Sequence, residues 1–293
     1  GGIPQEIRRI GDLYLNGMMG GSSDGGIQAK TNLLTDIGRV QLNLTMTGDK
    51  KFQGTIDTQN MDIRQLLDNK QFGNLTANVK LDGDFAPKQP TVNAQGIITE
   101  FTYNDYPFNH IGINGSYSAK GISGFLSIED PNLSAKLEGA IDNLTDKKGI
   151  HKIDIHGAIS HLNPQNLKLT DRWKNTVFAA TIDADFMAQT LNDAEGTLQI
   201  SNFSMNNGEE NTYYLDHLLI TAGFRDQLHY VTFDSDFAKA ELRGDFEYST
   251  LAQSLTNFIG SALPTLPGLP PISQKANNNF ALRLQVNKSD WLQ

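Results

Sequence analysis

The chain has 293 residues, of which 38% are hydrophobic and 19% are charged, and its net charge is −9. An acidic chain with scattered lysines and arginines is not expected to bind nucleic acid, which requires a basic surface. The absence of cysteine excludes disulfide bonds and cysteine-based zinc sites. No apolar run approaches the roughly 18 residues of a membrane-spanning helix, so the sequence is not expected to cross a bilayer.

Alternation of apolar and polar residues predicts strands along most of the chain. In chain order, the clearest runs are residues 40–48, 75–83, 153–159, 178–186, 196–201 and 280–287. Turn-forming clusters such as Asn114-Gly115 and Asn206-Asn207-Gly208 separate these runs. Short strands with one apolar and one polar face predict an all-β fold built from antiparallel sheet.

Helical signal is sparse. Residues 61–67 and 163–173 could each form two turns of helix, and residues 251–263 carry apolar side chains at helical spacing. For this last helix, Thr250 is the expected N-cap and Pro264 the expected stop. A proline-rich stretch follows it and predicts an extended connector.

The sequence repeats itself at intervals of roughly 100 residues. The stretch 54–85, strand then short helix then strand, returns as residues 157–186, and the motif at 135–139 returns at 240–244. Partial copies flank the two whole ones, so we expect a middle fragment of a longer array. The predicted units are the end of a preceding β-repeat at 1–53, complete β-repeats at 54–156 and 157–249, an amphipathic helix with a proline-rich insertion at 250–279, and the start of the next β-repeat at 280–293.

The apolar face of every strand must be covered, and three short helices cannot cover so many strands. Either two sheets close on each other, or one long antiparallel sheet curls so that its apolar face lines a continuous groove. Stacked tandem copies favour the groove, which would hold hydrophobic cargo. The predicted lining residues are Val40, Leu42, Leu44, Val79, Leu81, Leu126, Ile128, Leu137, Leu198, Ile200, Val231, Phe233 and Leu242. Their polar neighbours Gln41, Asn43, Asn78, Lys80, Ser127 and Thr232 are expected on the convex side.

The predicted helix at 251–263 has an apolar stripe that needs a partner. We expect Leu251, Leu255, Phe258 and Ile259 to dock against the concave face or mouth of the groove and to act as a plug. The alternative is a helix that only caps an edge of the sheet.

The strand–short helix–strand module, the run of G-x-I/L strands and the mid-repeat ends resemble the AsmA-like/TamB family of bacterial envelope proteins. The resemblance implies a U-shaped β-groove, or β-taco, within a Gram-negative periplasm, in a parent protein anchored to the inner membrane. It also implies lipid transport or outer-membrane protein assembly, with phospholipid as cargo and an Omp85-type outer-membrane barrel as partner. This sequence lacks the family's N-terminal anchor and C-terminal domain, which fits a middle section.

The histidines and the acidic clusters suggest other functions, but they support them less well. His151, His156 and His161 are five residues apart, which on a strand places neighbours on opposite faces and disfavours a shared metal. The acidic clusters Glu129-Asp130 and Asp234-Ser235-Asp236 could serve glycoside hydrolysis or calcium binding, but turns between strands explain them better.

The aromatic residues Tyr103, Tyr106, Phe108, Tyr213 and Tyr214 could form a sugar-binding platform, although packing at strand ends is the simpler explanation. No nucleophile elbow, P-loop or dinucleotide motif is present, so neither catalytic residues nor a cofactor or metal are expected, and the chain is not expected to be an enzyme. The alternatives that remain are a cell-surface adhesin or carbohydrate-binding β-repeat protein, and a structural spacer.

Overall fold

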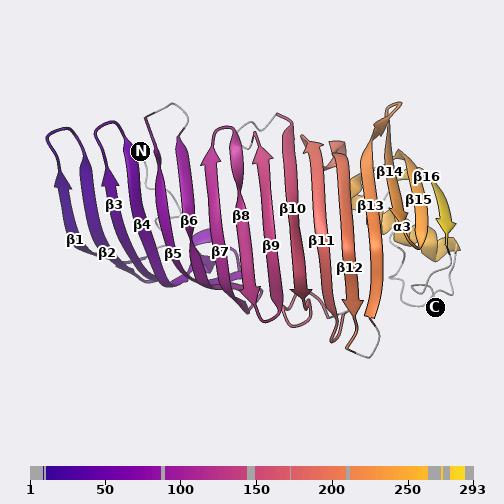
Figure 1. Ribbon diagram of the computed structural model, residues 1–293, viewed down its shortest axis with the longest axis horizontal. Coiled ribbons are helices and arrows are strands. Elements are labelled where there is room, and N and C mark those ends of the chain that lie inside the picture. Colours follow the sequence, from indigo (N-terminus) through magenta and orange to yellow (C-terminus); the bar gives the residue numbers. More distant parts are fainter. Residues whose placement is uncertain are drawn as a thin grey trace.

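The fold is a single open sheet of sixteen antiparallel strands, in which every strand pairs with the next one along the chain. The computed structural model describes residues 9, 11–86, 90–143, 149–171, 173–208, 212–262, 272 and 278–287. The strands lie side by side in chain order from β1 to β16 (Figure 1). The all-β prediction of one long antiparallel sheet with a few short helices is therefore confirmed.

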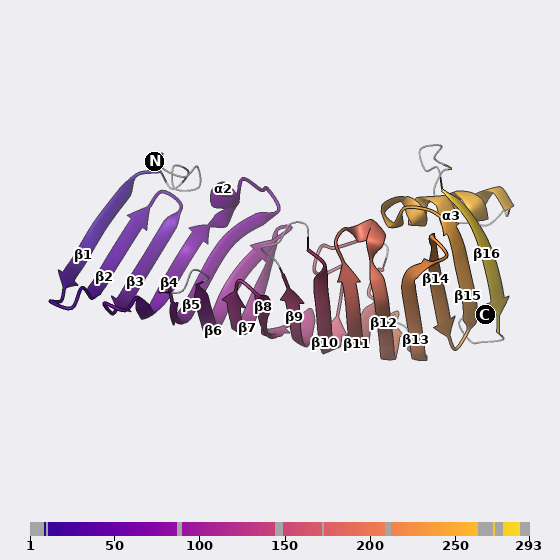
Figure 2. The ribbon, with the colours of Figure 1, turned by 90° about the horizontal axis from the view of Figure 1, so that it is seen from above.

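The strands are β1 (Leu13–Gly21), β2 (Ile27–Thr35), β3 (Gly38–Met46), β4 (Lys51–Asp62), β5 (Phe72–Asp84), β6 (Thr91–Tyr103), β7 (Tyr106–Ser118), β8 (Gly121–Asp130), β9 (Leu133–Asp142), β10 (His151–Leu162), β11 (Val177–Ala188), β12 (Glu195–Asn206), β13 (Thr212–Arg225), β14 (Leu228–Ser235), β15 (Ala238–Asp245) and β16 (Asn279–Val286). The helical elements are α2 (Ile63–Leu67), the short 3-10 helix η1 (Leu191–Asp193) and α3 (Tyr248–Ala262). Helices α2 and α3 lie on the same side of the sheet (Figure 2).

Tight turns produce this neighbour-to-neighbour order. Between β6 and β7, Asn104 and Asp105 have φ values of 49° and 58°, and between β13 and β14, Asp226 and Gln227 have φ values of 52° and 64°. Two consecutive left-handed residues are typical of the two-residue hairpin turn whose twist matches that of paired strands. Asn and Asp tolerate this conformation better than most residues, so the turn sequences favour hairpins.

β-Bulges interrupt the strands along one line across the sheet. Asn60 in β4, His110 in β7 and Asn202 in β12 adopt left-handed φ values of 47°, 51° and 50° within their strands. Asn60 and Asn202 lie at register shifts where β4 and β12 carry one residue more than their partners β5 and β11, and such an extra residue bends the strand. An extra residue also reverses which side of the sheet the following side chains face. In β6, Ile98 and Phe101 both lie on the apolar side although they are three residues apart.

The bend closes over a small corner core on the apolar side. Phe108, Ile111 and Leu167 are its buried centre. Side chains from both sides of the bulge line pack against it: Ile98, Phe101, Tyr103, Tyr106, Ile113, Leu126, Ile128, Leu133 and Leu162. Because residues from both arms of the bent strands meet here, the sheet folds toward its apolar face at this line.

Two runs of six strands, β4–β9 and β10–β15, have matching connections after their first strands. Asn69 N donates to Arg64 O at 3.1 Å in the first run, and Leu169 N donates to Pro164 O at 2.9 Å in the second. The predicted boundaries at 53/54 and 156/157 fall inside β4 and β10. The helix predicted at 163–173 is wrong, because the described residues there form successive turns.

The short helix predicted near 61–67 is present as α2, and Asp62 caps it by accepting a hydrogen bond from Arg64 N at 3.0 Å. The third predicted helix is present as α3, but it begins at Tyr248, so the predicted N-cap at Thr250 is wrong. Thr250 lies in the first turn, and its hydroxyl donates to Glu247 O at 3.3 Å. Pro264 lies outside the described residues.

Candidate functional site

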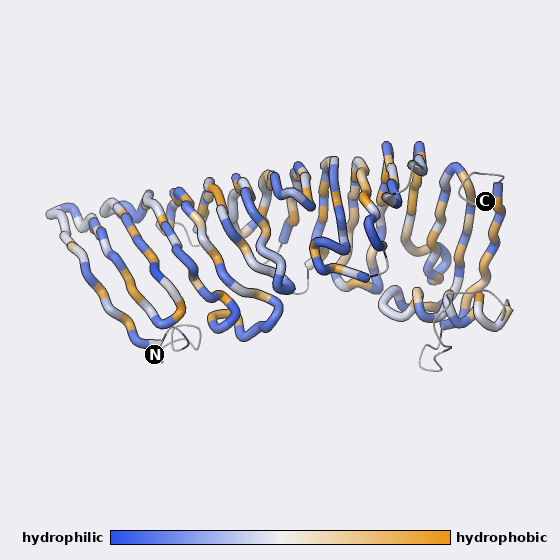
Figure 3. Tube along the Cα trace, turned by 90° about the horizontal axis from the view of Figure 1, so that it is seen from below, coloured by the Kyte–Doolittle hydropathy of each residue, from blue (hydrophilic) through white to orange (hydrophobic). Residues whose placement is uncertain are grey.

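The strand register aligns apolar residues and glycines into rows that run from β3 to β13 or β14, and we call this side of the sheet the apolar face. One row runs through directly paired positions: Leu42, Ile56, Val79, Gly96, Ile113, Leu126, Leu137, Gly157, Ile182, Ile200 and Leu218. A parallel row runs from Leu44 through Leu81 to Leu198, Ile220 and Phe233. Alternating hydropathy along many of the strands is visible in Figure 3.

Among the residues that the structure describes, no second layer covers most of the apolar face. The chain has an accessible surface of 19000 Å², whereas a compact monomer of 32.3 kDa would expose about 12,000 Å². Side chains such as Leu42, Val79 and Leu137 are partly exposed, because only their neighbours on the same face shield them. The face is therefore a large apolar surface of the kind that usually serves binding.

The register places all thirteen predicted lining residues on this face. Twelve of them are partly exposed, and only Leu242 is buried, with 5% of its surface exposed. A role in cargo binding stays a prediction. Leu242 differs from Leu137 in one respect that affects experiments: a charge introduced at Leu242 would be placed in a buried position, away from water.

The polar partners point to the opposite side, which we call the polar face. Gln41, Asn43, Asn78 and Lys80 are exposed there, and Ser127 and Thr232 are partly exposed. This face is not simply convex, since shallow depressions of about 710 Å³ and 520 Å³ lie on it. A twisted sheet is saddle-shaped, so each face is concave along one diagonal.

Helix α3 covers the apolar face at the C-terminal end through a chain of aromatic contacts. The Phe224 and His229 rings lie 4.3 Å apart, and the His229 and Phe246 rings lie 4.9 Å apart. Phe280 contacts both Phe246, at 6.5 Å, and Phe258 of α3, at 6.2 Å. Phe246 is only 2% exposed, so this part of the apolar face is well covered.

The predicted plug residues lie on α3. Leu251, Leu255 and Ile259 are partly exposed, and Phe258 contacts the sheet through Phe280 while keeping 49% of its surface exposed. The structure thus places the helix at one corner of the apolar face. Whether it yields to cargo stays a prediction, and the proline-rich segment expected to hold it lies outside the described residues.

Polar side chains attach the N-terminal half of α3 to the start of β16. The Asn278 amide donates to Thr250 Oγ1 at 3.1 Å and to Ser254 Oγ at 2.8 Å. Its carbonyl oxygen accepts from Glu247 N at 3.1 Å. Ser254 is buried. Strands β15 and β16 are adjacent in the sheet, and the Asn278 amide links the start of β16 to α3, which lies in the long connection between them.

Two histidines on the polar face each lie between two aspartates. His156 Nε2 is 2.5 Å from Asp154 Oδ1, and its Nδ1 is 3.2 Å from Asp183 Oδ2. The hydrogen bond to Asp183 is the main cause that raises the pKa of His156, and the Asp154 charge adds to it. Both aspartates therefore favour the protonated imidazole.

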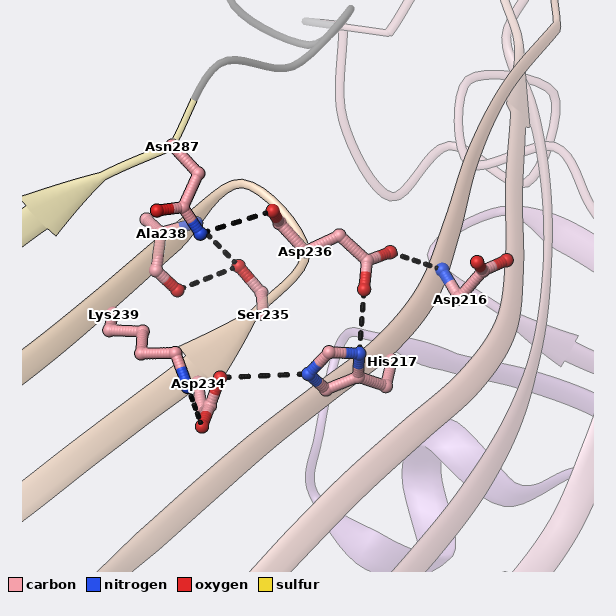
Figure 4. Close-up of polar contacts among 8 residues, drawn as sticks. All are labelled: Asp216, His217, Asp234, Ser235, Asp236, Ala238, Lys239 and Asn287. Atoms are coloured by element: carbon pink, nitrogen blue, oxygen red, sulfur yellow. Dashed lines mark hydrogen bonds and ion pairs between the residues drawn. The ribbon is translucent and has the colours of Figure 1, made fainter.

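His217, on β13 of the same unit, also lies between two aspartates (Figure 4). Its Nδ1 lies 2.6 Å from Asp236 Oδ1, and its Nε2 lies 3.6 Å from Asp234 Oδ1. A hydrogen bond from Lys239 is the main cause that lowers the pKa of Asp234. Within the described ranges, no set of histidines and carboxylates is arranged to hold a metal ion.

The acidic turn residues bind main-chain groups at the bulge line. Asp236 Oδ2 accepts from Asp216 N at 2.6 Å, and Asp130 Oδ2 accepts from Asn109 N at 3.1 Å in the preceding unit. Asp130 is only 5% exposed and also accepts the Tyr106 hydroxyl proton. These contacts give the acidic clusters a structural role at equivalent places in both units.

The predicted aromatic platform is divided between two places. Tyr103, Tyr106 and Phe108 belong to the corner core or pack against it. Tyr213 is partly exposed, and Tyr214 stands 69% exposed on β13. The five aromatic side chains therefore do not form one common surface.

In the part of the chain that the structure describes, no helix has the length and apolar character needed to cross a membrane. Comparison with known proteins finds no significant match to a family model, a curated protein or a solved structure.

Two features of the structure were not predicted from the sequence, although the sequence carries a signal for each. The aromatic contacts under α3 come from strand ends and connections. Phe224 and Phe246 lie outside the clearest alternating runs, and Phe280 is the first residue of the run at 280–287. On the polar face, Ile97 and Phe125 break the alternation of their own strands, since Ile98 and Leu126 already point to the apolar face. An apolar residue out of phase in a strand is the signal for an apolar spot on the polar face.

Proposed function

We propose that the chain is a segment of a periplasmic β-groove that shields hydrophobic cargo between the inner and outer membranes. The acyl chains of phospholipids are the favoured cargo, and unfolded outer-membrane protein segments are the other candidate. The observation that carries the proposal is the apolar face, which continues from strand to strand and is largely uncovered.

The energetics suit an acyl chain. Each buried methylene contributes about 0.8 kcal/mol, so a sixteen-carbon chain costs on the order of 12 kcal/mol to expose to water. Sixteen strands spaced by about 4.8 Å give a surface roughly 70 Å long. An acyl chain spans half of the ~30 Å hydrocarbon core, so the face offers a continuous path several chains long.

The cellular setting in this proposal follows from the resemblance to AsmA-like proteins. An inner-membrane anchor on the parent protein and an Omp85-type barrel as partner would place the two ends of the groove at the two membranes. The role would then be phospholipid transport or support of outer-membrane biogenesis.

The test uses two adjacent residues of β3 that face opposite sides. Leu42→Asp places a charge on the apolar face, between Thr31 and Ile56, and Asn43→Asp places the same charge on the polar face, between Lys30 and Thr55. Purified protein is mixed with vesicles that contain a fluorescent phospholipid, and bound lipid is measured by fluorescence and mass spectrometry. We expect several-fold less bound lipid for Leu42→Asp and no change for Asn43→Asp, with both circular dichroism spectra unchanged.

The proposal fails if the unmodified chain binds no lipid, or if both variants bind as much as the unmodified chain. A wide face open to water can hydrate a carboxylate at Leu42, so folding should be preserved. If Leu42→Asp nevertheless unfolds the protein, Leu44→Asp gives a second test on the same strand.

A further inference from the structure

Two large apolar side chains project from the polar face. Ile97 on β6 is 55% exposed and Phe125 on β8 is 42% exposed. Between β4 and β10, the described strands carry no other exposed large apolar side chain on this face. Exposing a large apolar side chain to water is unfavourable in proportion to its apolar area, so the exposure of Ile97 and Phe125 requires an explanation.

Ile97 and Phe125 flank a shallow depression of about 710 Å³. Gly112 forms part of its floor, since it pairs with Ile97 on one side and with Ser127 on the other. A Cβ atom at Gly112 would come within 2.5 Å of Ser127 Oγ and would fill this space. The volume falls within the range of about 300–1,000 Å³ that is typical of ligand sites.

The polar groups around the depression are mainly amides and hydroxyls. Asn78, Gln95, Thr99, Asn114 and Ser127 line it, and Lys80 is the only charged residue among its lining residues. Asn78 is already hydrogen bonded to Asp57. The side chains of Gln95 and Asn114 lie on paired positions and form no hydrogen bond with any described residue.

A neighbouring depression of about 520 Å³ shares Asn114 and Phe125 with the first. It extends from Asn93 on β6 across to Glu138 on β9 and His156 on β10. The two together form an elongated surface with Phe125 near its middle. An elongated ligand with several similar units fits this shape better than a single small molecule.

We propose that this surface binds a neutral oligosaccharide. The C–H faces of sugar rings pack against Phe125 and Ile97, because the face of an aromatic ring attracts weakly positive C–H groups. Sugar hydroxyls bond with the free amides of Gln95 and Asn114, which both donate and accept. Lys80 and His156 are far apart on this surface, and Glu138 and Asp154 oppose their charge, so it lacks the clustered cations that a phosphate group favours and a phospholipid headgroup does not fit. This inference is independent of the proposed lipid path, which uses the opposite face.

The test compares two substitutions on β8. Phe125→Ala removes the ring from the polar face, and Ile122→Ala removes a side chain of similar exposure, 44%, from the apolar face. Binding of soluble chito-oligosaccharides and malto-oligosaccharides to the purified chain is measured by calorimetry and by NMR chemical-shift changes. We expect affinity to fall about tenfold for Phe125→Ala and to stay unchanged for Ile122→Ala.

A second substitution, Asn114→Ala, should also weaken binding without changing the circular dichroism spectrum. The proposal is overturned if neither oligosaccharide binds at millimolar concentration, or if Phe125→Ala binds as well as the unmodified chain. It is also overturned if anionic phospholipid vesicles, and not the oligosaccharides, protect this surface from hydrogen exchange. Lipid binding through Leu42 can persist in each case, so the two proposals fail separately.

Discussion

The two ends of the sheet both carry apolar side chains on the apolar face, but these side chains are covered to very different extents. On β1, Leu15 and Met19 face the apolar side and are 62% and 75% exposed. Near the other end, Leu242 and Phe246 are 5% and 2% exposed beneath the aromatic contacts of α3. Strand pattern therefore determines which side is apolar, while a long connection between two adjacent strands determines whether that side is covered.

The largest contrast should come from truncating one apolar side chain at each end. Phe246→Ala should lower the free energy of unfolding by about 3–5 kcal/mol, because it leaves a cavity under α3. Leu15→Ala should change it by less than about 0.5 kcal/mol, because the side chain is already largely in water. Urea unfolding followed by circular dichroism measures both, and similar losses for the two variants would contradict the contrast.

A smaller loss of stability is expected when the contacts that hold α3 over the sheet are weakened and the apolar side chains are left unchanged. Asn278→Ala removes the hydrogen bonds to Thr250, Ser254 and the start of α3, and should cost about 1–2 kcal/mol. Hydrogen exchange should accelerate in α3 and not in β1–β3. If α3 acts as a plug, uptake of a fluorescent lipid should also increase, whereas unchanged uptake would leave it as an edge cap.

Removing a charge from the polar face should have the smallest effect on stability, because water reaches this face at both ends of the sheet. The pKa of His156 is raised above the ordinary value of 6.5, mainly by Asp183. Protonation in the folded state is thus favoured, so this contribution to stability is complete below pH 6.5 and is lost as the pH rises through the folded-state pKa. Asp183→Asn should lower the pKa measured by NMR with little change in the unfolding midpoint.

An unchanged His156 pKa in the Asp183→Asn variant would contradict this assignment. The matched control is Asp185→Asn, two residues further along the same strand. Asp185 pairs with Asp154 across the strands but makes its ion pair with Lys152. Asp185→Asn should therefore shift the pKa of His156 less than Asp183→Asn does.

The strands could be predicted from sequence because alternation is a local property. Residues 40–48 and 75–83 alternate without interruption, and both form strands with the expected apolar face. The line of bulges was not predicted, because Asn60 and Asn202 interrupt the alternation by a single residue that resembles an ordinary irregularity. Only the paired strands show that these residues align and bend the sheet.

The candidate site was predicted in part for the same reason. Face assignment of Val79 or Leu137 needs only their own strands, whereas exposure depends on distant segments. Leu242 is buried, whereas Leu137 is partly exposed at the matching place of the preceding unit, and nothing near Leu242 in the sequence indicates this difference. The start of α3 at Tyr248 likewise depends on Asn278, which bonds to Glu247 and Thr250 from 28 or more residues away.

The neighbour-to-neighbour order has a consequence for how such a sheet is made during synthesis on the ribosome. Every strand pairs with one that has just emerged, so the entropy cost of closing loops stays small for all-β architecture. No strand has to wait for a partner from the far end of the chain. The length of the sheet can therefore change by whole hairpins, each adding about 10 Å to the distance it spans, without redesign of a central core.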